Sequence, residues 1–190
     1  IEFYLQDYRW SKTSSRYYGQ VFYTEKTPKD EKEAQLWREN RESSYQGSSR
    51  HLIQSIIINQ ADAQGFRMYE SVEAPLGRER TNSYDVEFGK TILPFPVDSV
   101  RRVSLENGNF RIFWPQRVEI HYLKKYALNE YYVDFYHPIS WIIAPNGYFD
   151  VYRDGIPAHP TQLVLSGRMG RQRVARSLPY DFVPDLEFDD

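Results

Sequence analysis

The chain has 190 residues with a formal net charge of −2, and 41% of its residues are hydrophobic. This length and composition favour a folded domain with a buried core over a disordered chain. The near-neutral charge excludes a strong electrostatic attraction to nucleic acid or to an anionic membrane surface. The absence of Cys excludes disulfides and thiolate metal sites, and no apolar run approaches the roughly 20 residues that span a bilayer.

Two aromatic-rich runs at the start of the chain predict a β-hairpin. Residues 2–9 and 16–25 are separated by the polar segment 12–15. Apolar side chains recur at every second position in both runs, as at Phe3 and Leu5. Because successive side chains of a strand point to opposite faces, this spacing indicates two strands that each have one buried face.

Residues 29–64 predict two helices joined by a short break. Asp30 suits a helix start, Gly47 suits a helix end, and Ser48 or Ser49 suits the cap of a second helix. Spacings of three and four residues place a stripe of side chains on one face of each helix, and in the second helix this stripe is the expected buried face. The expected stripes are Ala34, Trp37, Arg41 and Tyr45 in the first helix, and Leu52, Ile53, Ile56, Ile57 and Ala61 in the second.

From Phe66 onward the sequence predicts short strands separated by turn residues. The expected strands are 67–72, 86–93, 100–105, 110–114, 118–123, 131–136, 139–143 and 148–152. This regular spacing favours an antiparallel meander or barrel-like sheet over βαβ units. We therefore predict an α+β fold that is mainly antiparallel sheet. It would form a single domain over residues 1–190, with the helical pair 29–64 inserted between strands near its N-terminal third.

The junction between the two helices carries the densest cluster of reactive side chains. Arg41, Tyr45, Arg50 and His51 surround a Gly-Ser break. The free N–H groups of a helix N-terminus beside guanidinium groups can hold an anion, so this cluster is a candidate binding site. Alternatively, Arg41 and Arg50 lock the helical pair to acidic residues of the sheet, and this structural role is the one we favour. We then expect Arg50→Ala to lower stability before it affects any activity.

Strand alternation suggests a second candidate site. If Val118, Ile120 and Tyr122 face the core, then Glu119 and His121 face outward. The residues that would share this outward face with Glu119 are Tyr132, Asp134, Tyr136, Tyr148 and Asp150. Two carboxylates about 5–9 Å apart among aromatic rings would suit glycoside hydrolysis, and the same face without catalysis would stack on sugar rings. An ordinary solvated sheet face produces the same pattern and is the default interpretation.

The four histidines do not indicate a metal site. No two of His51, His121, His137 and His159 have a ligand spacing such as His-x-x-x-His. We therefore predict no metal and no cofactor, and no catalytic residue is assigned.

Two runs resemble one family of envelope proteins. The run Arg41-x-x-x-Tyr45-x-Gly47-Ser48-x-Arg50-His51-Leu52, which ends at Gly65-Phe66, is similar to a segment of the Bacteroidetes carboxypeptidase-like regulatory-domain-containing proteins. The C-terminal run from Gly147-Tyr148 through 173–175 to 178–182 resembles the ending of the same family. Arg176 departs from this pattern, because relatives usually have an acidic residue there.

This resemblance implies an exported protein of the periplasm or cell surface with no established enzymatic activity. It also implies a small Ig-like β-sandwich in front of the region seen here, from which the family takes its name. The function we expect is non-enzymatic binding or scaffolding, linked to an outer-membrane uptake system. The expected partner is an envelope protein or a glycan, not a nucleic acid. A carbohydrate-binding domain is the second hypothesis, and a glycosidase-like hydrolase is the third.

Overall fold

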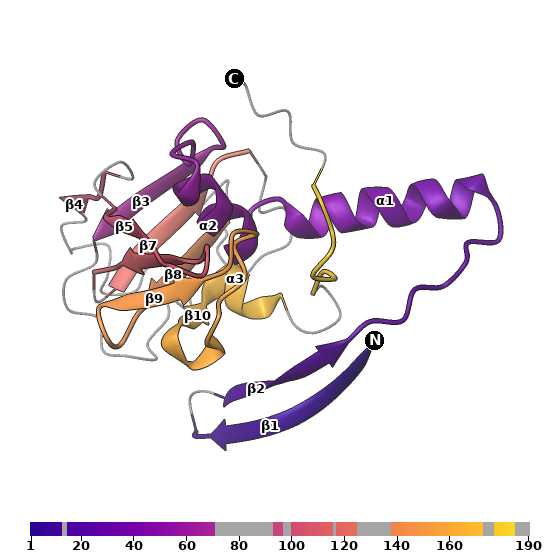
Figure 1. Cartoon of the computed structure of the whole chain (residues 1–190), viewed down its shortest axis with the longest axis horizontal. Coiled ribbons are helices and arrows are strands. Elements are labelled where there is room, and N and C mark those ends of the chain that lie inside the picture. Colours follow the sequence, from indigo (N-terminus) through magenta and orange to yellow (C-terminus); the bar gives the residue numbers. More distant parts are fainter. Residues whose placement is uncertain are drawn as a thin grey trace.

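The computed structural model describes residues 1–12, 15–70, 93–96, 100–115, 117–124, 138–172 and 177–184 (Figure 1). In chain order the elements are β1 (Glu2–Trp10), β2 (Ser15–Phe22), α1 (Glu31–Tyr45), α2 (Ser49–Ile57), β3 (Phe66–Glu70), β4 (Leu93–Pro94), β5 (Arg102–Ser104), β6 (Phe110–Phe113), β7 (Arg117–Tyr122), β8 (Ile139–Ile143), β9 (Tyr148–Val151), the 3₁₀ turn η3 (Pro160–Gln162), β10 (Val164–Ser166) and α3 (Gly167–Arg171). The predicted α+β class with mainly antiparallel sheet is confirmed.

The strands of the described residues form three sheets. The largest has five strands in the order β10-β8-β7-β3-β4, the second has three in the order β5-β6-β9, and β1 pairs only with β2. Every pairing is antiparallel. Among the described residues the sheets do not close into a barrel, so the barrel-like shape, one of the two expected for the β part, is not found there. The predicted strands 86–93, apart from Leu93, and 131–136 lie outside the described residues.

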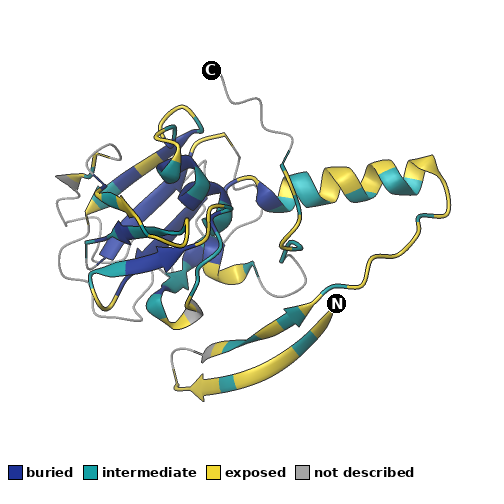
Figure 2. Cartoon of the chain, viewed as in Figure 1, coloured by how far each residue is buried: buried dark blue, intermediate teal, exposed yellow. Residues whose placement is uncertain are grey.

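The hydrophobic core lies where α2 and the two larger sheets meet. A single buried cluster is formed by one face of the five-stranded sheet, the inner face of the three-stranded sheet and the apolar face of α2. It includes Leu52, Ile53, Ile56, Phe66, Met68, Ile112, Trp114, Val118, Ile120, Ile142, Phe149 and Val151. The indole N–H of Trp114 donates to the backbone carbonyl of Ile142 at 3.2 Å and so ties the two sheets together. Figure 2 shows this buried interior in dark blue.

The helical pair lies between strands β2 and β3, as predicted, and its ends are fixed by local chemistry. The Asp30 carboxylate accepts a hydrogen bond from the Glu33 N–H at 2.7 Å and caps α1. Ser48 caps α2 by accepting from the His51 N–H at 3.1 Å. Gly47 between the helices has a φ of 73°, a left-handed conformation that favours glycine. The capping predictions are therefore confirmed.

The N-terminal part of the chain stands apart from the core. α1 is exposed along most of its length, and only Tyr45 at its C-terminal end is buried. The hairpin of β1 and β2 lies away from the two larger sheets, and its surface is almost entirely exposed or half-buried (Figures 1 and 2). No helix in the described part of the chain is long and apolar enough to cross a membrane.

Candidate functional site

The junction of α1 and α2 brings three of the four predicted cluster residues together. Tyr45 ends α1, and Arg50 and His51 lie in the first turn of α2. The Tyr45 ring lies 4.8 Å from the His51 ring between centroids, and the Tyr45 hydroxyl donates to the side-chain carbonyl of Gln54. Burial raises the pKa of this hydroxyl far above its ordinary value, so Tyr45 stays neutral.

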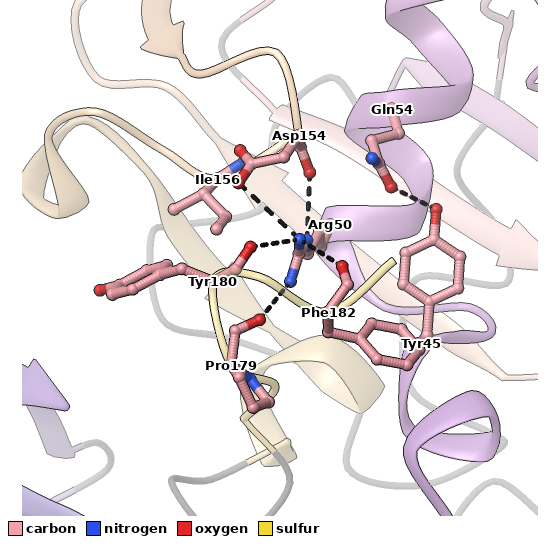
Figure 3. Close-up of polar contacts among 8 residues, drawn as sticks. All are labelled: Tyr45, Arg50, Gln54, Asp154, Ile156, Pro179, Tyr180 and Phe182. Carbon is pink, nitrogen blue, oxygen red and sulfur yellow. Dashed lines mark hydrogen bonds and ion pairs between the residues drawn. The ribbon is translucent and has the colours of Figure 1, made fainter. Parts of the chain in front are cut away.

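Arg50 uses its guanidinium group to hold backbone from two distant segments (Figure 3). Its Nε donates to the carbonyl of Asp154, in the turn after β9, at 3.1 Å. Its Nη1 donates to the carbonyl of Pro179 at 2.8 Å, and its Nη2 donates to those of Tyr180 at 3.0 Å and Phe182 at 2.9 Å. Because four of its five donors point to carbonyls of the chain, Arg50 acts as a structural clamp rather than an anion site.

The structural role predicted for Arg50 therefore agrees with its contacts, although the partners differ from those expected. The nearest acidic group is the Asp154 carboxylate, 3.7 Å from Nη2, whereas the hydrogen bonds go to carbonyls. Arg41 lies one turn before Tyr45 and is not part of the clamp. It makes a 3.7 Å ion pair with Glu25 in the segment before α1, not with the sheet, and its side chain is 38% exposed.

His51 is buried inside the junction and both of its ring nitrogens have partners. Nδ1 accepts the Gly47 N–H at 3.1 Å, so the proton of the neutral ring lies on Nε2, which faces the Gln64 side-chain carbonyl at 3.3 Å. The rings of Tyr45, Phe66 and Tyr122 lie within 5.7 Å of it between centroids. This burial lowers the pKa of His51 from 6.5 to about 4.

We expect this histidine to make stability depend on pH. The folded-state pKa lies below the unfolded value, so the unfolded chain binds a proton more readily between pH 6.5 and pH 4. The contribution of His51 is therefore fully present above about pH 6.5 and is lost as the pH falls toward 4. Between pH 7 and pH 5 the free energy of unfolding should drop by about 2 kcal/mol from this group.

Urea titrations of the wild type and of His51→Asn at several pH values measure this effect. Asn retains an acceptor for the Gly47 N–H but does not titrate, so the difference between the two curves isolates His51. The variant should lose the slope between pH 7 and pH 5. Parallel curves for the two proteins would mean that His51 has an ordinary pKa in the folded state.

The second predicted site does not form the exposed face that strand alternation suggested. Glu119 is 1% exposed and His121 is 9% exposed, so both faces of β7 are buried. The Glu119 carboxylate contacts His121 Nε2 at 2.8 Å and accepts the indole N–H of Trp141 at 3.0 Å. The prediction that Glu119 faces solvent is wrong. β7 lies between β3 and β8, and the side chains on both of its faces are buried.

Asp150 and Glu119 do not lie on adjacent strands. Asp150 is on β9 of the three-stranded sheet, whereas Glu119 is on β7 of the five-stranded sheet. Arg111 faces Asp150 across β6 and β9 and binds its carboxylate with two hydrogen bonds of 2.7 Å and 2.9 Å. These hydrogen bonds lower the pKa of Asp150, which favours a permanently ionised structural partner over a proton donor. The expected carboxylate pair is therefore absent for these two residues.

The other residues that were expected on the same face as Glu119 fall into two groups. Tyr148 is half-buried on β9, where the Arg111 guanidinium lies 4.3 Å above its ring. Tyr132, Asp134 and Tyr136 lie outside the described residues. Within the described part of the chain, no group of three or more His, Asp or Glu side chains is arranged to hold a metal ion.

One exposed apolar surface lies on the β1–β2 hairpin, and strict alternation of side chains along β1 does not give its residues correctly. Strand β1 contains a bulge between Leu5 and Asp7, where Gln6 is the extra residue. The bulge shifts the alternation by one position, so that Phe3 and Leu5 share a face with Tyr8 and Trp10. The face predicted to be buried held Phe3, Leu5, Val21 and Tyr23. That prediction is wrong for Leu5, which is more than half exposed, whereas the other three are half-buried. Tyr8 and Trp10, which the bulge adds to the face, are also more than half exposed. The apolar residues of this face change from odd to even positions at Gln6, and this change in the sequence could have indicated the bulge.

No protein-family model, curated protein or solved structure matches this chain. The resemblance to the envelope family therefore stays a prediction from the sequence.

Proposed function

We propose that the chain is a non-enzymatic binding or scaffolding module of an exported envelope protein. In this proposal the module docks a partner protein of an outer-membrane uptake system through one face of its β1–β2 hairpin. The exposed apolar surface of that hairpin is the observation that carries the proposal.

We call this surface the hairpin face. The register of β1 and β2 places on it the side chains of Phe3, Leu5, Tyr8, Trp10, Tyr17 and Val21. The opposite face is mixed, with Glu2, Tyr4, Asp7, Arg9, Tyr18, Gln20 and Phe22. On the hairpin face, Leu5 is 56% exposed, Tyr8 55% and Trp10 71%. A sheet that is apolar on one face and mixed on the other is built to be covered on the apolar side.

Two physical arguments favour a partner protein as the molecule that binds over the hairpin face. An isolated two-stranded hairpin is only marginally stable in water, so burial of its apolar face would stabilise it. Exposed Tyr and Trp side chains are also the residue types that dominate binding energy at protein interfaces. The hairpin face combines both properties, because Tyr8 lies directly opposite Tyr17 and next to Trp10 in the same face.

The interior polar groups support binding over catalysis. Arg50 and His51 are committed to contacts within the fold, and Asp150 is held by Arg111. The Glu119 carboxylate is buried against His121 and Trp141. The glycosidase-like alternative needs two accessible carboxylates on one surface, and neither Glu119 nor Asp150 meets that need.

Site-specific photo-cross-linking in the exporting cell tests the proposal. A photoreactive phenylalanine analogue at Tyr8 reports contacts of the hairpin face, and the same group at Gln20 reports contacts of the opposite face. We expect position 8 to yield one reproducible cross-linked envelope protein that position 20 does not yield. The Leu5→Lys substitution should abolish this product, because it places a charge in the apolar contact. Equal labelling from both positions would contradict docking through the hairpin face.

Carbohydrate binding remains the second candidate, and the same face favours it. The rings of Tyr8, Trp10 and Tyr17 are all exposed on one side of the hairpin, and such rings stack on the C–H faces of sugars. A glycan array followed by thermal shift separates the two candidates. A glycan that raises the melting temperature of the wild type but not of Trp10→Ala would favour the carbohydrate ligand over the protein partner.

A further inference from the structure

The C-terminal strap, residues 177–184, crosses the junction of α1 and α2 (Figures 1 and 3). Arg50 binds it through the carbonyls of Pro179, Tyr180 and Phe182. All three hydrogen bonds go to the main chain of the strap. Recognition of this kind depends on the backbone path of the segment, here a turn at Tyr180 and Asp181, and is tolerant of its side chains.

The clamp keeps its position without help from the strap. The Nε of Arg50 is held by the Asp154 carbonyl, and the Asp154 carboxylate lies 3.7 Å from Nη2. Gly155 brings the turn after β9 against α2, since a Cβ at this position would lie 2.7 Å from the Arg50 carbonyl oxygen. The guanidinium would therefore stay in place, with its Nη1 and Nη2 groups presented, if the strap left.

Two aromatic contacts complete the site. The Phe182 ring packs against Tyr45 at 5.9 Å between centroids, and the Tyr180 ring packs edge-on against Tyr23 at 6.4 Å. Burial raises the pKa of the Tyr23 hydroxyl. The strap thus offers two rings that are two residues apart in sequence, from the same residues whose carbonyls Nη2 of Arg50 holds.

The strap is held by the Arg50 clamp and by side-chain contacts rather than by strand pairing. It belongs to none of the sheets of the described residues, and the backbone hydrogen bond within it joins the Phe182 N–H to the Pro179 carbonyl at 3.2 Å. Tyr180 is 60% exposed and Val183 is 83% exposed. A segment with few buried contacts opens at a lower free energy than the core.

We propose that the site formed by Arg50, Tyr45 and Tyr23 binds a polypeptide turn, and that the strap occupies it in cis. The ligand class is a turn-forming segment with two aromatic residues separated by one residue, held by its main-chain carbonyls. The residues of this site are not among those of the hairpin face, so it adds a second binding function and does not depend on the first.

Competition between the strap and a peptide supplied in trans tests the proposal. The probe is a fluorescein-labelled peptide of residues 177–184, SLPYDFVP, with blocked ends, and the measurement is fluorescence anisotropy with the full chain. A tethered strap competes at an effective concentration in the millimolar range, so wild type should bind the probe weakly. The full-length variant Tyr180→Ala/Phe182→Ala weakens the strap but leaves the site intact. It should bind the probe at least about tenfold more tightly.

Two controls address the clamp. Arg50→Lys, combined with the strap substitutions, keeps the charge and the aliphatic stem but loses the fork of donors, and it should bind the probe at least about tenfold more weakly. A probe with an ester in place of the amide between Tyr180 and Asp181 has a weaker acceptor at the Tyr180 carbonyl. This probe should bind roughly fivefold more weakly even if Arg50→Lys does not fold. Equal binding to the wild type and to the strap variant, or equal binding of the amide and ester probes, would overturn the proposal.

Discussion

Replacing Arg50 with Ala is expected to lower the free energy of unfolding by about 4 kcal/mol, the largest effect of any single polar substitution in the helical pair. The side chain is 11% exposed and makes four hydrogen bonds to carbonyls of two segments more than 100 residues away in sequence. Charge-assisted hydrogen bonds contribute about 1.5–3 kcal/mol each, but carbonyls near the surface regain water when the clamp is lost. The expected effect is therefore smaller than their sum.

Urea denaturation followed by far-UV circular dichroism measures this effect. The matched control is Arg38→Ala on α1, where the arginine is 60% exposed and pairs with Glu31 at 2.6 Å. An exposed pair of this kind contributes at most about 1 kcal/mol. If the two variants lose the same small amount of stability, Arg50 is not the clamp described here.

Gly47→Ala is expected to lower the free energy of unfolding by a similar amount, about 4 kcal/mol. Gly47 has a φ of 73°, where any residue with a Cβ incurs a cost of about 1–2 kcal/mol. In addition, a Cβ would lie 2.6 Å from Cδ1 of Tyr122, a buried ring packed against His51 and Phe66. The ring cannot move away without disturbing the core, so the steric overlap adds to the backbone cost.

Gly108→Ala separates the two costs. Gly108 has a φ of 77°, but nothing lies within 4 Å of the Cβ position. This variant should therefore show only the backbone cost of about 1–2 kcal/mol. Thermal and urea unfolding of both variants measure the difference, and equal losses would show that the Tyr122 ring adjusts freely to the added methyl group.

Local features of the helical pair were predictable because each depends on a few neighbouring residues. The cap at Asp30 requires only the N–H of Glu33, three residues away, and the cap at Ser48 requires only that of His51. The glycine at position 47 indicates a left-handed turn by itself. The role of Arg50 was favoured as structural, but its partners lie near residues 154 and 180, and no local pattern indicates them.

The faces of the strands were less predictable because they depend on the order of strands in the sheets. Alternation along β7 separates Glu119 from Ile120, but it does not reveal that both faces of the strand are covered. What packs above and below the sheet decides this, and no pattern within one strand specifies that packing. In the same way, Asp150 was placed beside Glu119 because its strand has the same pattern, whereas pairing with β6 puts it in another sheet.

The hairpin shows the opposite error. A period-two pattern in β1 correctly indicates a strand with an apolar face, but it was read as a buried face. Burial depends on what packs against the strand, and within the described residues Leu5, Tyr8 and Trp10 remain exposed. The pattern therefore indicates an apolar surface that another molecule can cover. For this reason the proposed function is assigned to the hairpin face.

The affinity of the cross-linked partner for hairpin variants tests the proposed function most directly. Isothermal titration calorimetry of that purified partner against Trp10→Ala should show at least about a 30-fold loss, as expected for a central aromatic residue worth about 2 kcal/mol. Leu36→Ala removes an apolar side chain of similar exposure, 54%, from α1 and should change the affinity by less than about threefold. Unchanged binding by Trp10→Ala, with a loss in Leu36→Ala, would contradict docking through the hairpin face.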